Sequence, residues 1–223
     1  MSEPRSHTVP PAMEDFVPDA RWDKEQWRDV FPLLIDQYVW DKNGHKPVTQ
    51  VKLQYTADYL YVIFRVQDRY VRSIHTRYCD LVCQDACVEM FFNPAPDAGR
   101  SYFNIESNCG GVLYFSYQTG RDENVVSVSE EDAKLLNVAT TLPAIVDPEI
   151  EGPLTWVVEY RVPFAMLEKY GPVRRPAPGV TWRANFYKCA EINSHPHYGS
   201  WSPIGLPRPD FHAPQFFGML TFG

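Results

Sequence analysis

Hydrophobic and polar residues alternate along several short stretches of the chain. Within residues 49–56, the apolar residues Val51, Leu53 and Tyr55 are separated by polar ones, which is the pattern of a strand with one buried face. Residues 59–66 (YLYVIFRV) are apolar at almost every position, and this predicts a central strand with both faces buried. The two stretches are separated by a short polar turn and are therefore expected to be neighbours.

Similar stretches continue to the end of the chain and indicate an all-β fold. A hairpin is expected around Gly110 and Gly111, and Pro163 opens a short helix over residues 164–169. No long helical period appears between the strands. We therefore predict an antiparallel β-sandwich, jelly-roll-like, with few short helices. The further strands are expected at residues 87–92, 101–108, 111–117, 124–129, 154–162, 180–188 and 216–222.

The start of the chain differs in character from the rest. Residues 1–20 are polar and rich in proline, so an extended segment on the surface is expected there. Trp22 and Trp27 follow in a short turn or helical start, which is expected to insert both indoles into the body. Residues 49–223 contain no internal repeat or linker, and we expect residues 21–223 to form one sandwich domain.

Composition narrows the range of partners. The 223 residues carry a net charge of -7, and no basic cluster stands out beyond Arg174 and Arg175, so nucleic acid is not an expected partner. No stretch approaches the roughly 20 apolar residues of a membrane span, so no membrane partner is expected. Aromatic residues make up 14% of the chain, which suits strands and also suits flat surfaces for stacking.

The cysteines and the first residues bear on the compartment. The five cysteines are an odd number without the spacing of a disulfide scaffold, which favours reduced thiols buried as small apolar residues. The first residues (MSEPRSHTVPPAMEDF) lack the features of a signal peptide. The sequence as written is therefore expected to be cytoplasmic, or secreted or periplasmic if its start has been trimmed.

Four segments, taken in order, carry a family resemblance. They are 55–62 (YTADYLYV) with 65–68 (RVQD); 84–92 (QDACVEMFF); 182–188 (WRANFYK); and 201–203 (WSP) with 209–218 (PDFHAPQFFG). Together they resemble the family 9 carbohydrate-binding modules and their family 9-like relatives. The resemblance implies a β-sandwich that binds sugars without cleaving them, in modules often appended to glycoside hydrolases and supporting carbohydrate catabolism.

The resemblance also implies a position for the sugar. The founding modules hold the end of a sugar chain between two tryptophan rings, and the second ring falls at Phe211 in this sequence. Residues 80–83 (DLVC) stand where the first ring is expected, with Tyr78 the nearest aromatic residue. An arginine of the founding modules falls near Asn104. A one-sided stacking platform is therefore expected in place of a two-ring clamp.

The residue types themselves point to the same chemistry. Sugars present C–H faces to aromatic rings and hydroxyls to amides and carboxylates. Phe211 is expected to be exposed, because Pro209 and Pro214 bracket it in a loop, whereas Glu89 lies in an apolar strand and is either a site residue or paired with an arginine. The predicted sugar-binding residues are Phe211, Tyr187, Glu89, Asn104, Asn185, Trp201 and His212. No catalytic residue is assigned.

Two other functions remain open from sequence. An enzyme of the same fold could use a metal held by His195, His197 and His212, or a carboxylate pair around Glu89 with Glu106 or Glu159 as its partner. A protein-interaction sandwich is the third possibility. The sequence predicts no cofactor, although calcium is possible at the aspartates Asp58, Asp68 and Asp80. The expected partner is a mono- or oligosaccharide.

Overall fold

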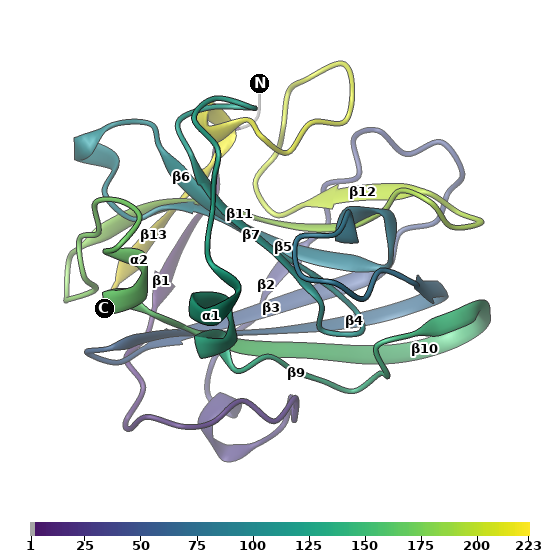
Figure 1. Ribbon diagram of the computed structural model, residues 1–223, viewed down its shortest axis with the longest axis horizontal. Helices are drawn as coiled ribbons and strands as arrows, with labels where there is room; N and C mark the ends of the chain where they lie inside the picture. The colour runs from purple at the N-terminus through teal and green to yellow at the C-terminus, as the bar shows by residue number, and fades with distance from the viewer. Residues whose placement is uncertain (1–2) are drawn as a thin grey trace.

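Two β-sheets packed face to face form the body of the protein, described for residues 3–223 by a computed structural model (Figure 1). The larger sheet has the order β1 (Ser6–Val9), β13 (Gly218–Phe222), β11 (Thr181–Ala190), β5 (Cys87–Asn93), β6 (Tyr102–Asn108), β7 (Leu113–Gln118) and β8 (Val126–Ser127), with β12 (His197–Ser200) also paired to β11. The smaller sheet has the order β2 (Leu33–Ile35), β3 (Val48–Tyr55), β4 (Tyr59–Ser73), β10 (Val146–Pro163) and β9 (Ala139–Thr140).

Short helical turns connect these strands. The two α-helices are α1 (Glu130–Ala133) and α2 (Phe164–Leu167), and the 3-10 turns are η1 (Glu25–Trp27), η2 (Val82–Gln84), η3 (Pro96–Ala98), η4 (Lys134–Leu136) and η5 (Pro214–Phe216). Every strand pairing is antiparallel except that of β1 with β13. The predicted all-β sandwich with few short helices is confirmed.

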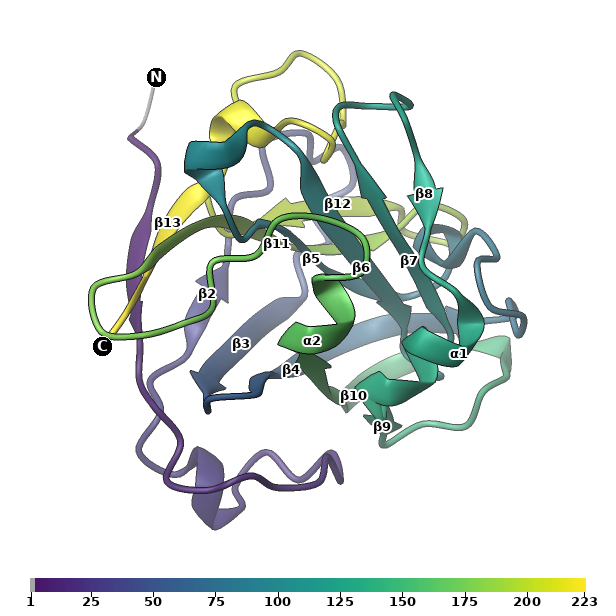
Figure 2. The same ribbon diagram turned by 60° about the vertical axis from the view of Figure 1, so that its left-hand side comes forward.

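The main core lies between the two sheets (Figure 2). Val88, Met90 and Phe92 alternate along β5 and face this layer, as the two-residue period of a strand requires. From the other sheet, Phe64 and Trp156 pack into the same layer and are fully buried. Burying an aromatic or aliphatic side chain of this size contributes about 1.5 to 3 kcal/mol each, so this layer is the main source of stability.

The strand boundaries differ from the predicted ones where polar residues continue the backbone pairing between strands. The strands predicted at 59–66 and 154–162 continue in β4 and β10 as a long ribbon, because backbone pairing persists through residues such as Tyr70 and Glu151. The strand predicted at 124–129 shrinks to β8. It stops there because the Ser129 hydroxyl accepts a hydrogen bond from the backbone N–H of Asp132 and caps α1.

The N-terminal segment joins both sheets. β1 pairs in parallel with β13 at the edge of the larger sheet, so the segment expected on the surface contributes a strand. The chain then crosses the outer face of the smaller sheet, as the purple ribbon shows in both views (Figures 1 and 2). Trp22 and Trp27 are buried there, which confirms that both indoles insert into the body.

Glu159 anchors this crossing segment. Its carboxylate is fully buried and accepts hydrogen bonds from the Trp27 indole N–H at 2.8 Å and from the backbone N–H groups of Asp19 and Ala20, each at 2.8 Å. The Lys24 ammonium lies 2.7 Å from the same carboxylate. One acidic side chain on β10 therefore satisfies four donors of a segment that has little regular structure of its own.

Replacing Glu159 with alanine should destabilise the protein strongly. The change leaves the Trp27 indole and two backbone N–H groups without their acceptor, and the buried Lys24 ammonium with Asp19 as its remaining carboxylate; the combined cost should be about 3 to 5 kcal/mol. Urea unfolding should show the loss as a lower midpoint. The control is Glu130→Ala, which removes an exposed pair with Lys134 and should change stability by less than about 0.5 kcal/mol. Equal effects of the two substitutions would contradict the anchoring role.

Candidate functional site

The outer face of the larger sheet is lined by aromatic, polar and thiol side chains. Because side chains alternate along a strand, Val88 and Met90 point into the core and their neighbours on β5 point to the outer face. The residues of β6 and β11 that pair with these neighbours also point to the outer face. The outward residues are Cys87, Glu89 and Phe91 on β5, Tyr102, Asn104 and Glu106 on β6, and Asn185, Tyr187 and Cys189 on β11; all are buried.

A covering loop, residues 201–217, packs over this face. It is the yellow segment above the larger sheet in Figure 1. Beneath it lies a pocket of about 280 Å³. The residues around the pocket are Cys83, Glu89, Phe91, Glu106, Arg121, Glu191, Tyr198, Pro209, Asp210, Phe211 and His212. The pocket therefore combines aromatic rings, carboxyl groups and one guanidinium.

Phe211 is the aromatic residue that the covering loop presents to the pocket. Its ring stacks on Tyr187, with centroids 4.1 Å apart and planes inclined by 8°, and the Tyr187 hydroxyl donates to the Phe211 carbonyl at 3.1 Å. Trp40 and Tyr198 lie against the same ring. Phe211 is only 9% exposed, so the expectation of an exposed loop platform is wrong. The stacking on Tyr187 holds the ring in place.

Glu89 and Glu106 form the acidic floor of the pocket. They are directly opposite each other on β5 and β6, so both carboxyl groups lie on one face of the sheet. Glu89 accepts from the Cys189 thiol at 3.0 Å, and Glu106 accepts from the Asn104 amide at 2.9 Å. Within residues 3–223 Glu89 forms no ion pair, which removes the alternative that it is paired with an arginine.

The electrostatics of this pair follow from burial. Burial raises the pKa of both Glu89 and Glu106, and for Glu89 the neighbouring Glu106 raises it further. Two adjacent carboxyl groups in such a place retain a proton to higher pH than exposed ones do. A protonated carboxyl donates a hydrogen bond and an ionised one only accepts, so the floor can offer both kinds of partner to hydroxyl groups.

His212 lines the pocket in its neutral form. The Gln118 amide N–H donates to His212 Nδ1 at 2.8 Å, and the Tyr102 hydroxyl lies 2.9 Å from the same nitrogen. Because an amide nitrogen can only donate, Nδ1 carries no proton. Burial lowers the pKa of His212 to about 4, in agreement with a neutral ring. Beside it, Asp210 pairs with Arg121 and fixes the covering loop to the turn after β7.

Four of the predicted residues do not line the pocket. Asn185 is fully buried and exchanges two hydrogen bonds with the backbone of Ser202, at 2.8 and 3.1 Å, which fix the start of the covering loop. Trp201 packs on Phe186 in the core between the sheets. Tyr187 and Asn104 lie one layer beneath the lining residues that they contact. A direct contact of these four with sugar stays a prediction.

Several lining residues have no signal in the sequence. Arg121, Glu191 and Tyr198 come from segments that are neighbours only in the folded chain. Tyr198 lies on β12, a strand of only four residues whose pattern is too short to recognise. Trp40 reaches Phe211 from the loop after β2, where its indole N–H donates to the Leu206 carbonyl at 2.8 Å.

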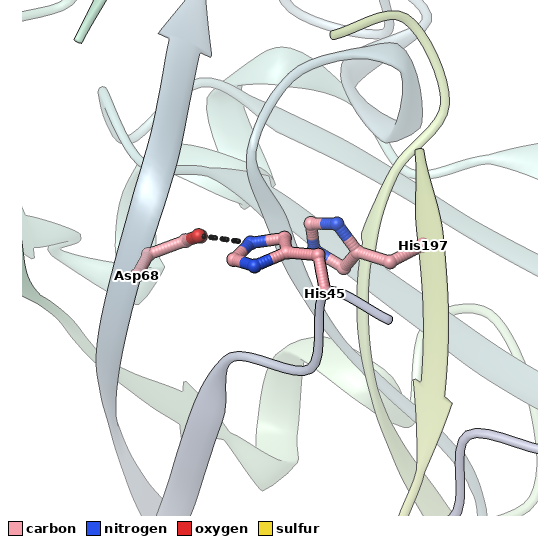
Figure 3. A group of neighbouring side chains, drawn as sticks. All are labelled: His45, Asp68 and His197. Atoms are coloured by element: carbon pink, nitrogen blue, oxygen red, sulfur yellow. Dashed lines mark hydrogen bonds and ion pairs between the residues drawn. The ribbon is translucent and has the colours of Figure 1, made fainter. Parts of the chain in front are cut away.

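A separate polar cluster links the two sheets. Figure 3 shows His45 between Asp68 and His197, and His45 Nε2 lies 2.8 Å from the Asp68 carboxylate. From β11, the Lys188 ammonium lies 2.8 Å from His197 Nε2 and 3.5 Å from Asp68. The ligand types suit a metal, but the ammonium of Lys188 already occupies the space between two of the three donors. The cluster is therefore a structural charge network.

The predicted metal site of His195, His197 and His212 is wrong, because the fold does not bring the three side chains together. His212 lines the pocket, and His195 stacks on Tyr70 with centroids 3.6 Å apart. Neither belongs to a group of possible metal ligands in the described part of the chain. The proposed partner Glu159 is likewise separate from Glu89, because it anchors the N-terminal segment on the smaller sheet.

The calcium candidates do not share a site either. Asp68 belongs to the network with Lys188, and Asp80 accepts from the backbone N–H of Arg77 at 2.9 Å. Asp58 lies in the exposed turn between β3 and β4. In residues 3–223 these three aspartates form no common group of metal ligands.

Comparison with known proteins identifies the family. The profile of carbohydrate-binding family 9 matches residues 24–222. The chain belongs to carbohydrate-binding family 9. None of the curated proteins matches the sequence. In the described residues no helix is long and apolar enough to cross a membrane.

Solved structures of similar fold include family 9 modules. A proposed carbohydrate-binding protein from Bacteroides uniformis ATCC 8492 is 28% identical, with a TM-score of 0.89 over 99% of this chain and 100% of that chain. A family 9 module from Caldicellulosiruptor kristjanssonii in complex with cellotriose is 15% identical, with a TM-score of 0.66 over 98% and 93% of the two chains. A family 9 module from Caldicellulosiruptor kristjanssonii in complex with glucose is also 15% identical, with a TM-score of 0.65 over 97% of this chain and 96% of that chain.

The Lys188 network predicts a pH effect on stability. Burial, together with the positive charge of Lys188, lowers the pKa of His197 to about 3 from its ordinary value of 6.5. Between these values the unfolded chain binds a proton at this position and the folded chain does not. Stability due to His197 is therefore complete above about pH 6.5 and falls with decreasing pH, by about 1.4 kcal/mol per unit.

The measurement is urea unfolding of the parent and of His197→Gln between pH 4.5 and 7. The comparison is needed because Glu89 and Glu106, whose pKa values are raised, act in the opposite direction in both proteins. The difference in unfolding free energy, parent minus variant, should shrink steadily as the pH is lowered. A difference that does not depend on pH would show that His197 is not held neutral.

Proposed function

We propose that this protein binds a gluco-configured saccharide in the pocket beneath the covering loop and does not cleave it. The observation that carries the proposal is the Phe211 ring, which is braced on Tyr187 beside the acidic floor of Glu89 and Glu106. Similar folds with bound glucose and cellotriose support the choice of sugar class.

The two kinds of surface in the pocket match the two kinds of surface on a sugar. The C–H groups of a pyranose pack against apolar ring atoms, and Phe211, held in place by Tyr187, lines the pocket with the small part of its ring that remains exposed. The hydroxyl edge needs donors and acceptors, which the carboxyl groups on the floor supply. Arg121 and His212 extend the polar side of the same pocket.

The size of the pocket favours the end of a chain over its middle. Its volume of about 280 Å³ is near the lower limit of small-molecule pockets, which is about 300 Å³. About one sugar unit therefore fits beneath the covering loop, and further units extend into solvent. Because only a small part of the Phe211 ring is exposed to the pocket, we expect a modest dissociation constant of about 0.1 to 1 mM.

Replacing Phe211 with leucine tests the stacking contact. Leucine keeps an apolar side chain against Tyr187 but removes the flat ring, so affinity should fall about tenfold or more while the fold is retained. Calorimetric titration with glucose, cellobiose and cellotriose is the measurement. The control is Phe31→Leu, because Phe31 is 83% exposed and does not line the pocket.

Three outcomes separate the possible functions. Weaker binding by Phe211→Leu with unchanged binding by Phe31→Leu supports the proposed site. Equal binding by both variants places the sugar elsewhere on the molecule. If the parent protein binds no sugar of the panel, the protein-interaction function is favoured. Thermal unfolding of each variant shows whether a loss of binding is a loss of folding.

We expect no hydrolysis of the bound sugar. A glycosidase needs two carboxyl groups that flank the scissile bond. Glu89 and Glu106 instead lie side by side on one face of the sheet, so both approach a ligand from the same side. Incubation with cellotriose should release no reducing sugar. Turnover by the parent protein that disappears in Glu89→Gln would establish the enzyme instead.

A further inference from the structure

A thiol cluster lies at the inner end of the pocket floor. Cys87 on β5 and Cys189 on β11 are directly opposite each other in the antiparallel pair, and both side chains point away from the core. The two sulfur atoms and a carboxylate oxygen of Glu89 all lie within 4.8 Å of one another. The Cys189 thiol donates to Glu89 at 3.0 Å. Three metal-ligating atoms thus converge on one point from two adjacent strands.

This geometry is close to that of a bound metal ion. Ligands at the usual 2.0 to 2.3 Å from zinc lie about 3.5 to 3.8 Å from one another in a tetrahedron. Small side-chain rotations bring the three donors to such positions, because one pair is already 3.0 Å apart and no pair is more than 4.8 Å apart. The strands hold the backbone of all three residues in continuous ladders, so the site needs no rearrangement of the fold.

Within residues 3–223, the carboxyl groups around this cluster form no ion pair with a lysine or arginine. Three thiols and three carboxyl groups gather here, two of the thiols and one carboxyl group within 4.8 Å of one another. Arg121 is paired with Asp210, and Lys188 lies on the opposite face of the sheet with Asp68. The six acidic groups are Cys83, Cys87, Cys189, Glu89, Glu106 and Glu191.

We propose that Cys87, Cys189 and Glu89 bind a thiophilic divalent cation of the zinc type. Two sulfur donors select against calcium and magnesium, which prefer all-oxygen sites. Glu89 and Cys83 line the pocket, so the cation reaches the cluster from solvent through the pocket, and Cys83 offers a third sulfur on that side. This site differs from the Lys188 network, where an ammonium already lies among the donors.

Metal titration of the reduced, chelator-treated protein tests the proposal. Calorimetry with Zn²⁺ should show one ion bound per chain. Titration with Co²⁺ should give a sulfur-to-cobalt charge-transfer band, which reports thiolate ligands directly in the unmodified protein. Binding should also raise the unfolding temperature of the parent protein, because the assembled ligands exist only in the folded state. A phosphine reductant keeps the thiols free without competing for the metal.

Cysteine variants identify the ligands. Cys87→Ser and Cys189→Ser should each weaken Zn²⁺ binding at least 100-fold and remove the charge-transfer band, whereas Cys79→Ser, a cysteine outside the cluster, should bind like the parent. Unfolding of the metal-free variants checks that each is folded. The proposal is overturned if the parent shows no thiolate band with Co²⁺, or if Cys79→Ser loses the ion as completely as Cys189→Ser. Sugar titration is independent of every one of these results.

Discussion

The alternation of side chains across the larger sheet is the constraint on which the rest of the structure depends. Each residue of β5, β6 and β11 must face either the sandwich core or the outer layer, and in this protein both layers are buried. The inner layer is almost entirely apolar and supplies stability. The outer layer therefore carries the chemistry, because Glu89, Tyr187 and Cys189 can lie there without disturbing the core.

The same constraint places adjacent residues of one strand in two different electrostatic environments. On β11, Lys188 points inward to Asp68 and the next residue, Cys189, points outward to Glu89. The inward ammonium has paired oxygen and nitrogen partners, which is what a buried charge requires. The outward groups instead hold their protons to higher pH than exposed groups do, because burial raises the pKa of Glu89, and a hydrogen bond with Cys87 together with burial raises that of Cys189. Two adjacent residues of β11 thus take part in an ion pair on one face of the sheet and in an acidic cluster on the other face.

The inner layer could be predicted from the sequence, because strand periodicity is a local property. The segment 87–92 shows its alternation directly, and β5 follows it closely. The covering loop could not be predicted in the same way. Proline residues around Phe211 suggested exposure, but the ring is buried because Tyr187 and Trp40 approach it from distant parts of the chain. Short strands such as β12 have too few residues to show a period, so Tyr198 was missed for a related reason.

The covering loop has a consequence for how such a protein can diversify. Strands of the larger sheet supply the floor of the pocket, and each floor residue has a neighbour in the core, so substitutions there are constrained by folding. The opposite wall comes from one continuous segment that includes Pro209, Asp210 and Phe211. Insertions and replacements in that segment alter the wall without disturbing the ladder. Related proteins can therefore differ in the ligand they bind through substitutions in this one loop, while the sheet beneath it stays unchanged.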